Sequence, residues 1–190
     1  METNGPQLES QHLLLRLARQ EDVVAIVRYY TEHQAYLAPF EPRKSPQFYT
    51  QAHWKREVKA RVEEFATDRS LKLILFEKEN FEAIVGTLNF TNFIRGAFHS
   101  CTVGYSIAEA KQGCGYMREA LSIAIDYAFT ELNLHRITAA YLPHNQRSGK
   151  LLKRLGFVVE GYARDYLRID DCWQDHILTS RINTNWRSDF

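Results

Sequence analysis

The stretch that decides the fold covers residues 104–127 and reads GYSIAEAKQGCGYMREALSIAIDY. Its first residues form an apolar, strand-like run that ends at Ile107, and a polar turn containing two glycines follows. From Met117 onward the apolar residues recur with the period of a helix. The stretch therefore predicts a strand, a tight loop and the N-terminus of a helix.

Such a junction is suited to binding an anion. The first turn of a helix has backbone N–H groups without partners and carries the positive end of the helix dipole, which together favour a phosphate. Gly113 and Gly115 would let a ligand approach the backbone closely. The alternative is that both glycines only shape the turn and cap the helix, so the rest of the chain has to decide.

Length, composition and charge predict one domain without a strong overall field. A chain of 190 residues with 45% hydrophobic side chains can bury one sizeable core, so we expect a single domain over residues 1–190. The 24 basic and 23 acidic side chains give a net charge of +1. That balance provides no general attraction to nucleic acid or to a membrane surface.

The cysteines and the N-terminus point to the cytoplasm. Cys101, Cys114 and Cys172 are too scattered for a disulfide framework, and none has the spacing of a metal site. The first residues, METNGPQLES, lack the pattern of a signal peptide. Apolar runs also fall short of the roughly 18 residues that cross a bilayer. We therefore expect a cytoplasmic protein with no membrane partner and no metal.

Hydrophobic periodicity predicts alternating strands and helices along the rest of the chain. We expect strands at residues 12–18, 71–77, 83–93, 98–107, 135–142, 157–169 and 172–182, and helices at 21–32, 45–67, 117–132 and around 151–155. The proline-rich segment 36–46 is expected to be a surface loop without regular structure. This order predicts an α/β domain with a largely antiparallel sheet.

Two motifs extend the argument from the central stretch. The first is Gln-Gly-Cys-Gly-Tyr-Met at residues 112–117, and the second is Asn-Gln-Arg-Ser at 145–148, followed by Gly156 and Phe157. With the element order, they resemble the GCN5-related N-acetyltransferase (GNAT) family, whose pyrophosphate loop has the pattern Gln/Arg-x-x-Gly-x-Gly/Ala. Met117 departs from the small residue usual at the last position. Similarity to the ribosomal-protein N-acetyltransferases of that family lies at residues 37–42, 89–101, 104–107 and 143–149.

The resemblance implies a fold, a cosubstrate and a partner. The fold would be the α/β (α+β) acyltransferase fold, a mostly antiparallel seven-stranded sheet flanked by helices. The donor would be acetyl-coenzyme A (acetyl-CoA), and the acceptor a protein N-terminal amine, in particular the alanine of a ribosomal protein, with association with the ribosome. The residues that it places at the coenzyme are Tyr105, Ser106 and Ile107 for the pantetheine arm, Gln112, Gly113, Cys114, Gly115, Tyr116 and Met117 for the pyrophosphate, and Asn145 and Ser148 from the other side.

The chemistry favours an N-terminal acceptor. Acetyl transfer from a thioester to an amine needs a neutral amine, a donor to the oxyanion and a proton for the departing thiolate. A backbone α-amine has a pKa of about 7.7–8.0, against about 10.4 for lysine. Presenting it neutral at about pH 7.5 costs under about 0.7 kcal/mol, whereas a lysine would cost about 4 kcal/mol. An N-terminal amine therefore needs little help from a general base.

The identity of the base is open in the sequence. Many relatives have a carboxylate on the strand just before the Gly-Tyr pair, and the matching residue here is Thr102. Glu41, in the proline-rich segment, is the first candidate, although an exposed loop glutamate is usually only solvated. Glu160 and His99 are weaker candidates, because each lies in a strand pattern and has an equally good structural explanation.

The proton donor and the thiol chemistry also have alternatives. Ser148 lies three residues beyond Asn145, where its hydroxyl could protonate the thiolate or form a local bond to its own helix. Gly149 would give clearance to the cofactor or reflect loose packing. Cys114, at a helix N-terminus, could form an acetyl-cysteine, but a spectator thiol is favoured because no His–Asp pair accompanies it.

Two other functions fit the same donor motif. The first is acetylation of small amines, and the second is a ribosome-assembly or RNA-binding factor with a vestigial acetyl-CoA site. Basic residues at 43–44 and 147–154 could meet an adenosine phosphate or RNA, or be solvated helix ends. Aromatic residues could line an acceptor groove or belong to the core, namely Trp54, Phe90, Phe93, Phe98, Tyr162, Tyr166 and Trp173.

Overall fold

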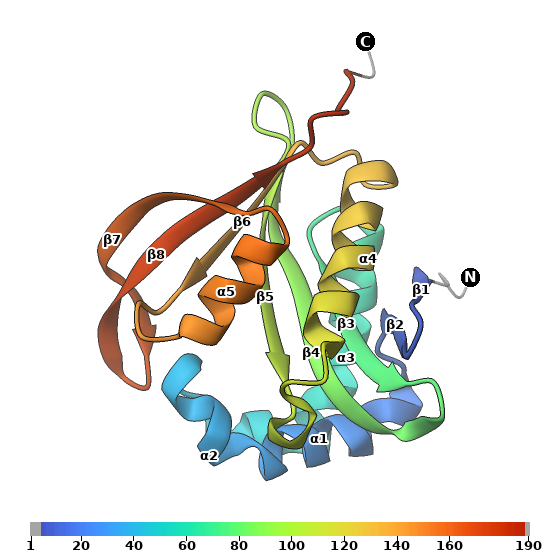
Figure 1. Ribbon diagram of the computed structural model, residues 1–190. Helices are drawn as coiled ribbons and strands as arrows, with labels where there is room; N and C mark the ends of the chain where they lie inside the picture. The colour runs from blue at the N-terminus through green and yellow to red at the C-terminus, as the bar shows by residue number, and fades with distance from the viewer. Residues whose placement is uncertain (1–4, 189–190) are drawn as a thin grey trace.

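The computed structural model, which describes residues 5–188, has one eight-stranded sheet (Figure 1). In spatial order its strands are β1 (Gln7–Glu9), β2 (Leu13–Leu17), β3 (Leu71–Glu77), β4 (Asn80–Ile94), β5 (Ser100–Ile107), β6 (Arg136–Tyr141), β8 (Cys172–Ile182) and β7 (Val158–Ile169). Every neighbouring pair is antiparallel except β5 and β6. The predicted α/β class with a largely antiparallel sheet is confirmed, with one strand more than expected.

The additional strand is β1, which pairs with β2 at the edge of the sheet. Its three residues are too few to show a hydrophobic period, so sequence pattern could not identify it. The expectation that the chain begins without a signal peptide falls partly on residues 1–4, which lie outside the described residues.

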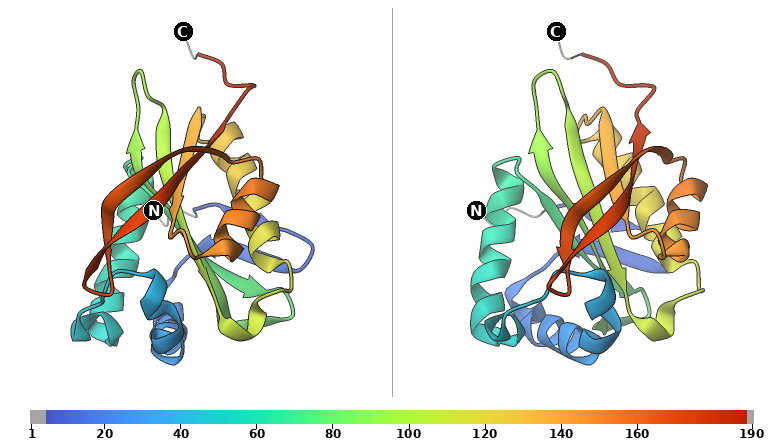
Figure 2. Two further views of the ribbon diagram at one scale, coloured as in Figure 1. Left: turned by 60° about the vertical axis from the view of Figure 1, so that its left-hand side comes forward. Right: turned by 90° about the vertical axis from the view of Figure 1, so that its left-hand side faces the viewer.

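Helices cover both faces of the sheet (Figure 2). They are α1 (Val23–Glu32), α2 (Gln34–Leu37), α3 (Gln51–Ala66), α4 (Tyr116–Thr130) and α5 (Gln146–Arg154). Strand β3 illustrates the division, because Leu73 and Leu75 pack in one buried cluster with α4 and α5, while Ile74 and Phe76 pack in another with α1 and α3. Within residues 5–188, no helix is both long and apolar enough to cross a membrane.

The proline-rich segment contains more regular structure than predicted. The short helix α2 and a 3₁₀ turn at Ala38–Phe40 occupy its first part, residues 36–40, and the side chain of Leu37 there is buried. Proline suits the first positions of a helical turn because its missing N–H has no partner there anyway. The following helix was also predicted to begin too early: Pro46–Tyr49 form a 3₁₀ turn, and Thr50 caps α3.

The aromatic residues divide between the core and the surface. Trp54 and Phe90 are fully buried, and Phe93 is partly buried against the core. By contrast, more than two fifths of Phe98, Tyr162, Tyr166 and Trp173 is exposed. The last three lie on the β7–β8 hairpin, where β7 is the free edge of the sheet. Alternating spacing therefore did not indicate burial in this hairpin.

The sheet opens between β5 and β6. These strands pair only where Ser100–Thr102 meet Arg136–Thr138, although β5 continues to Ile107 and β6 to Tyr141. We call the opening between residues 103–107 and 139–141 the β5–β6 wedge. Because β5 remains paired with β4 up to Ile107, the wedge leaves the other edge of β5 without a strand partner.

Candidate active site

The loop between β5 and α4 has the form of an anion-binding turn. Gly113 and Gly115 have φ angles of 76° and 81°, and Gly115 is the N-cap of α4. A Cβ at either position would meet nothing within 4 Å, so the positive φ, rather than crowding, requires glycine. Among residues 5–188, the N–H groups of 113–118 have no hydrogen-bond partner. The predicted strand, loop and helix N-terminus are confirmed.

The other residues of this loop point in different directions. The Gln112 side chain contacts the guanidinium of Arg147, which lies on α5. The Cys114 side chain is exposed, and its Sγ lies 3.7 Å from the carbonyl oxygen of Gln112. Met117 is buried in the core beneath α4. Its bulk therefore stays away from the loop, which explains how a large residue is tolerated at this position.

The end of β5 presents its side chains alternately to the two faces of the sheet. Ser106 is buried between the hydroxyls of Tyr29, at 3.0 Å, and Thr87, at 2.9 Å. Only its backbone is therefore available to a ligand in the wedge. The Tyr105 side chain crosses the other face and reaches α5, where its hydroxyl lies 2.7 Å from Ser148 Oγ. Burial raises the pKa of Tyr105 to about 12, so this phenol keeps its proton.

The start of α5 is fixed by its cap. Asn145 Oδ1 accepts a hydrogen bond from the Ser148 N–H at 3.2 Å, which satisfies one of the free donors of the helix. The Ser148 hydroxyl bonds to Tyr105 and not to its own helix. A Cβ on Gly149 would lie 2.8 Å from the Tyr141 ring. The interpretation of Gly149 as clearance for the cofactor was therefore wrong, because the Tyr141 ring occupies that space.

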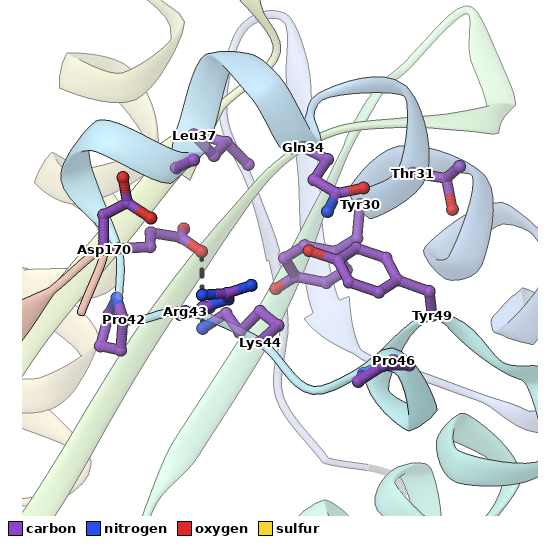
Figure 3. Close-up of a pocket in the computed structure, with 12 residues that line it drawn as sticks. Tyr30, Thr31, Gln34, Leu37, Pro42, Arg43, Lys44, Pro46, Tyr49 and Asp170 are labelled. Carbon is purple, nitrogen blue, oxygen red and sulfur yellow. Dashed lines mark ion pairs between the residues drawn. The ribbon is translucent and has the colours of Figure 1, made fainter.

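A pocket of about 720 Å³ lies between α1, α2, the segment that follows α2 and the β7–β8 turn (Figure 3). Glu41 and Lys44 line it and form an ion pair at 3.5 Å. Burial raises the pKa of Glu41, and Lys44 partly opposes that shift. Glu41 is thus a half-buried carboxylate at a cavity and not the solvated loop residue of the alternative interpretation.

The pocket adjoins the wedge through α1. Tyr30 lines the pocket, and the preceding residue, Tyr29, bonds to Ser106 at the end of β5. Burial raises the pKa of Tyr29, and the nearby Glu41 charge adds to the shift. On the far side, the Asp170 N–H donates to the carbonyl oxygen of Glu41 at 3.3 Å. The β7–β8 turn therefore closes over the pocket.

Glu160 and His99, the weaker candidates for the base, are held by contacts that are structural. Glu160 accepts a bond from Ser180 at 2.7 Å and pairs with Arg136, which hold the pKa of its carboxyl below the ordinary value. His99 precedes β5, six residues and about 20 Å of extended chain from Tyr105. Its ring packs against Trp186 at 5.0 Å. The structure brings neither residue to the wedge.

These features can be compared with known proteins. Residues 12–158 match the family described as the acetyltransferase (GNAT) domain. The chain therefore belongs to the GNAT family and is an N-acetyltransferase that uses acetyl-CoA as its donor.

Three members of that family are similar to this chain over most of its length. The chain is 41% identical to the ribosomal protein uS5-alanine N-acetyltransferase of Escherichia coli K12 over 181 residues, which cover 95% of this chain and 92% of that protein. The crystal structure of ribosomal-protein-S5-alanine acetyltransferase from Vibrio fischeri superimposes with a TM-score of 0.92 at 40% identity, covering 96% of this chain and 100% of that one. Mycobacterium smegmatis RimJ, solved with CoA-disulfide, gives 0.85 at 28% identity, with 93% and 86% covered.

Proposed function

We propose that this protein acetylates the N-terminal amine of a ribosomal protein whose first residue is alanine. The observation that carries the proposal is the 41% identity to the uS5-alanine N-acetyltransferase along almost the whole of both chains. It follows that residues 1–190 act as one catalytic domain in the cytoplasm, where ribosomal proteins are made, and that the enzyme meets its acceptor on or near the ribosome.

The donor would lie along the wedge. The free N–H groups that follow Gln112 suit the pyrophosphate, because they lie at the positive end of α4. The unpaired edge of β5 at residues 105–107 suits the amide groups of the pantetheine arm, which can bond to it as a strand would. Asn145 would hold the N-terminus of α5 against the arm from the opposite side.

Glu41 would receive the acceptor amine. A raised pKa makes this carboxylate a better proton acceptor than an exposed glutamate. The amine then loses its proton to Glu41, directly or through water, and its nitrogen attacks the thioester carbonyl. Because an α-amine has a pKa of about 7.7–8.0, only a modest base is needed.

Ser148 would complete the reaction. As the carbon–sulfur bond breaks, the Ser148 hydroxyl gives its proton to the coenzyme A thiolate. The neutral Tyr105 phenol, at 2.7 Å, donates to Ser148 in the same movement and later regains a proton from water. The products are the acetylated amine and free coenzyme A. As the intermediate collapses, the nitrogen gives its second proton to water, which balances the proton that Tyr105 regains, and Glu41 releases the first proton to solvent.

The acceptor class is tested by offering competing amines. The protein is incubated with labelled acetyl-CoA and peptides that begin with alanine, serine or methionine, beside polyamines and aminoglycosides. We expect the peptide that begins with alanine to be labelled faster than the other amines. Label confined to the small amines would refute the peptide assignment, and no turnover combined with salt-sensitive binding to ribosomes would indicate an assembly factor.

A further inference from the structure

The loop at residues 112–115, which is the part of the 112–117 motif that precedes α4, is attached at both ends to one carboxylate at the end of β3. Lys111 immediately precedes the loop, and its Nζ lies 2.7 and 2.8 Å from the two carboxylate oxygens of Glu77. Tyr116 immediately follows the loop, and its hydroxyl donates to Glu77 Oε1 at 2.8 Å. Residues 112–115 therefore form a short span whose two flanking side chains converge on a single acceptor.

We propose that Glu77 is a positioning residue that holds residues 112–115 in the shape that binds the pyrophosphate, and so sets the affinity for acetyl-CoA. The inference rests on the donor site of the proposed function. It does not depend on which amine accepts the acetyl group.

The loop needs such a restraint because of its composition. Two of its four residues are glycines at positive φ, which lose more conformational freedom on ordering than any other residue. The N-terminus of α4 also has no side-chain cap that would fix the turn from within. An attachment at each end limits the conformations of the span and leaves its N–H groups free for a ligand.

Glu77 is held in the sheet from both sides. It is the last residue of β3, where Leu13 of β2 and Asn80 of β4 are its register partners on either side. Bonds from Lys111 and Tyr116 lower the pKa of Glu77, so the carboxylate is charged at neutral pH. The ammonium group of Lys111 is paired with this carboxylate, so it is not a free cation beside the loop.

The test compares donors with and without a pyrophosphate. In Glu77→Gln the charge of the attachment is lost, and we expect the KM for acetyl-CoA and the Kd for coenzyme A to rise about tenfold, with kcat unchanged. S-acetyl-pantetheine lacks the pyrophosphate, so its kcat/KM should be the same for the variant and the parent. Calorimetric titration of coenzyme A measures the affinity without any acceptor.

Matched variants separate positioning from general damage. Glu79→Gln removes an exposed charge two residues away and should leave both donors unaffected. Lys111→Met and Tyr116→Phe should each raise the Kd for coenzyme A, and combining either with Glu77→Gln should add less than the sum.

Three results would overturn the inference. The first is a kcat/KM of Glu77→Gln that falls equally with acetyl-CoA and with S-acetyl-pantetheine. The second is an unchanged Kd for coenzyme A. The third is tighter binding of coenzyme A by Glu77→Gln, because the freed Lys111 engages the phosphate. If the parent protein binds coenzyme A but acetylates no peptide, the acceptor assignment fails while the positioning role is still measured by titration.

Discussion

Replacing Ser148 by alanine tests the proposed proton donor. A coenzyme thiol has a pKa of about 8.5, so protonating its thiolate at about pH 7 is worth about 2 kcal/mol, or about thirtyfold in rate. Ser148→Ala should therefore lower kcat by up to about thirtyfold at neutral pH. Tyr105→Phe leaves the serine but removes its 2.7 Å partner, which should cost about 1 kcal/mol, or about fivefold.

The dependence on pH distinguishes this role from a packing defect. Ionisation of the acceptor amine affects parent and variant alike, so the ratio of their kcat values isolates the leaving group. The assay follows thiol release from acetyl-CoA with an alanine peptide between about pH 6.5 and 9.5, and the ratio should approach unity above about pH 8.5.

Tyr141→Phe serves as the matched control. The Tyr141 ring packs against the same helix at Gly149, but it takes no part in the hydrogen bond between Tyr105 and Ser148. Any loss of rate in this variant should therefore be constant across the pH range. A deficit of Ser148→Ala that is below twofold, or that stays constant across the pH range, would refute the role of Ser148.

Three further substitutions address the acceptor site, the loop and the core. Glu41→Gln should slow acetylation of the alanine peptide but raise the Tm at neutral pH. Because burial raises the pKa of Glu41, the stability of the parent falls as the pH rises above 4.5, the ordinary pKa of a glutamate. The difference in Tm between variant and parent should therefore vanish below about pH 4.5. Gly115→Ala, at φ 81°, should cost about 1–2 kcal/mol in loop strain and raise the KM for acetyl-CoA, whereas Gly161→Ala, with open space and no positive φ, should not. Trp54→Ala should lower the free energy of unfolding by about 3–5 kcal/mol in urea titration, because the ring is fully buried against Tyr30; a loss below about 1 kcal/mol would contradict this.

The donor loop was predictable because its signals are local. Two glycines, a preceding apolar strand and a helical period after Met117 all lie within one short stretch, and each reports on its own backbone. The capping role of Asn145 was not predicted, although it too is local, because it depends on a helix that begins at the next residue. Local chemistry of this kind can be identified without knowledge of the fold.

The contacts that complete the site were not predictable, because they join distant residues. Glu77 lies 34 residues before Lys111 and reads only as the end of a strand. The partner of Gly149 is an aromatic ring on a different element, so the sequence indicated free space but not its occupant. The burial of Glu41 likewise depends on α1 and on the β7–β8 turn, which meet it only in the folded chain.

The wedge has a consequence for how the protein responds to its cosubstrate. Strands β1–β5 and strands β6–β8 are joined within the sheet by only three residue pairs, so the two halves of the sheet are held together by a short stretch of strand pairing. A pantetheine arm bonded to β5 would supply contacts that longer pairing would otherwise provide. Coenzyme A would then act as a thermal stabiliser of the C-terminal half of the sheet, and amide hydrogen exchange in β6 and β8 should slow when it binds.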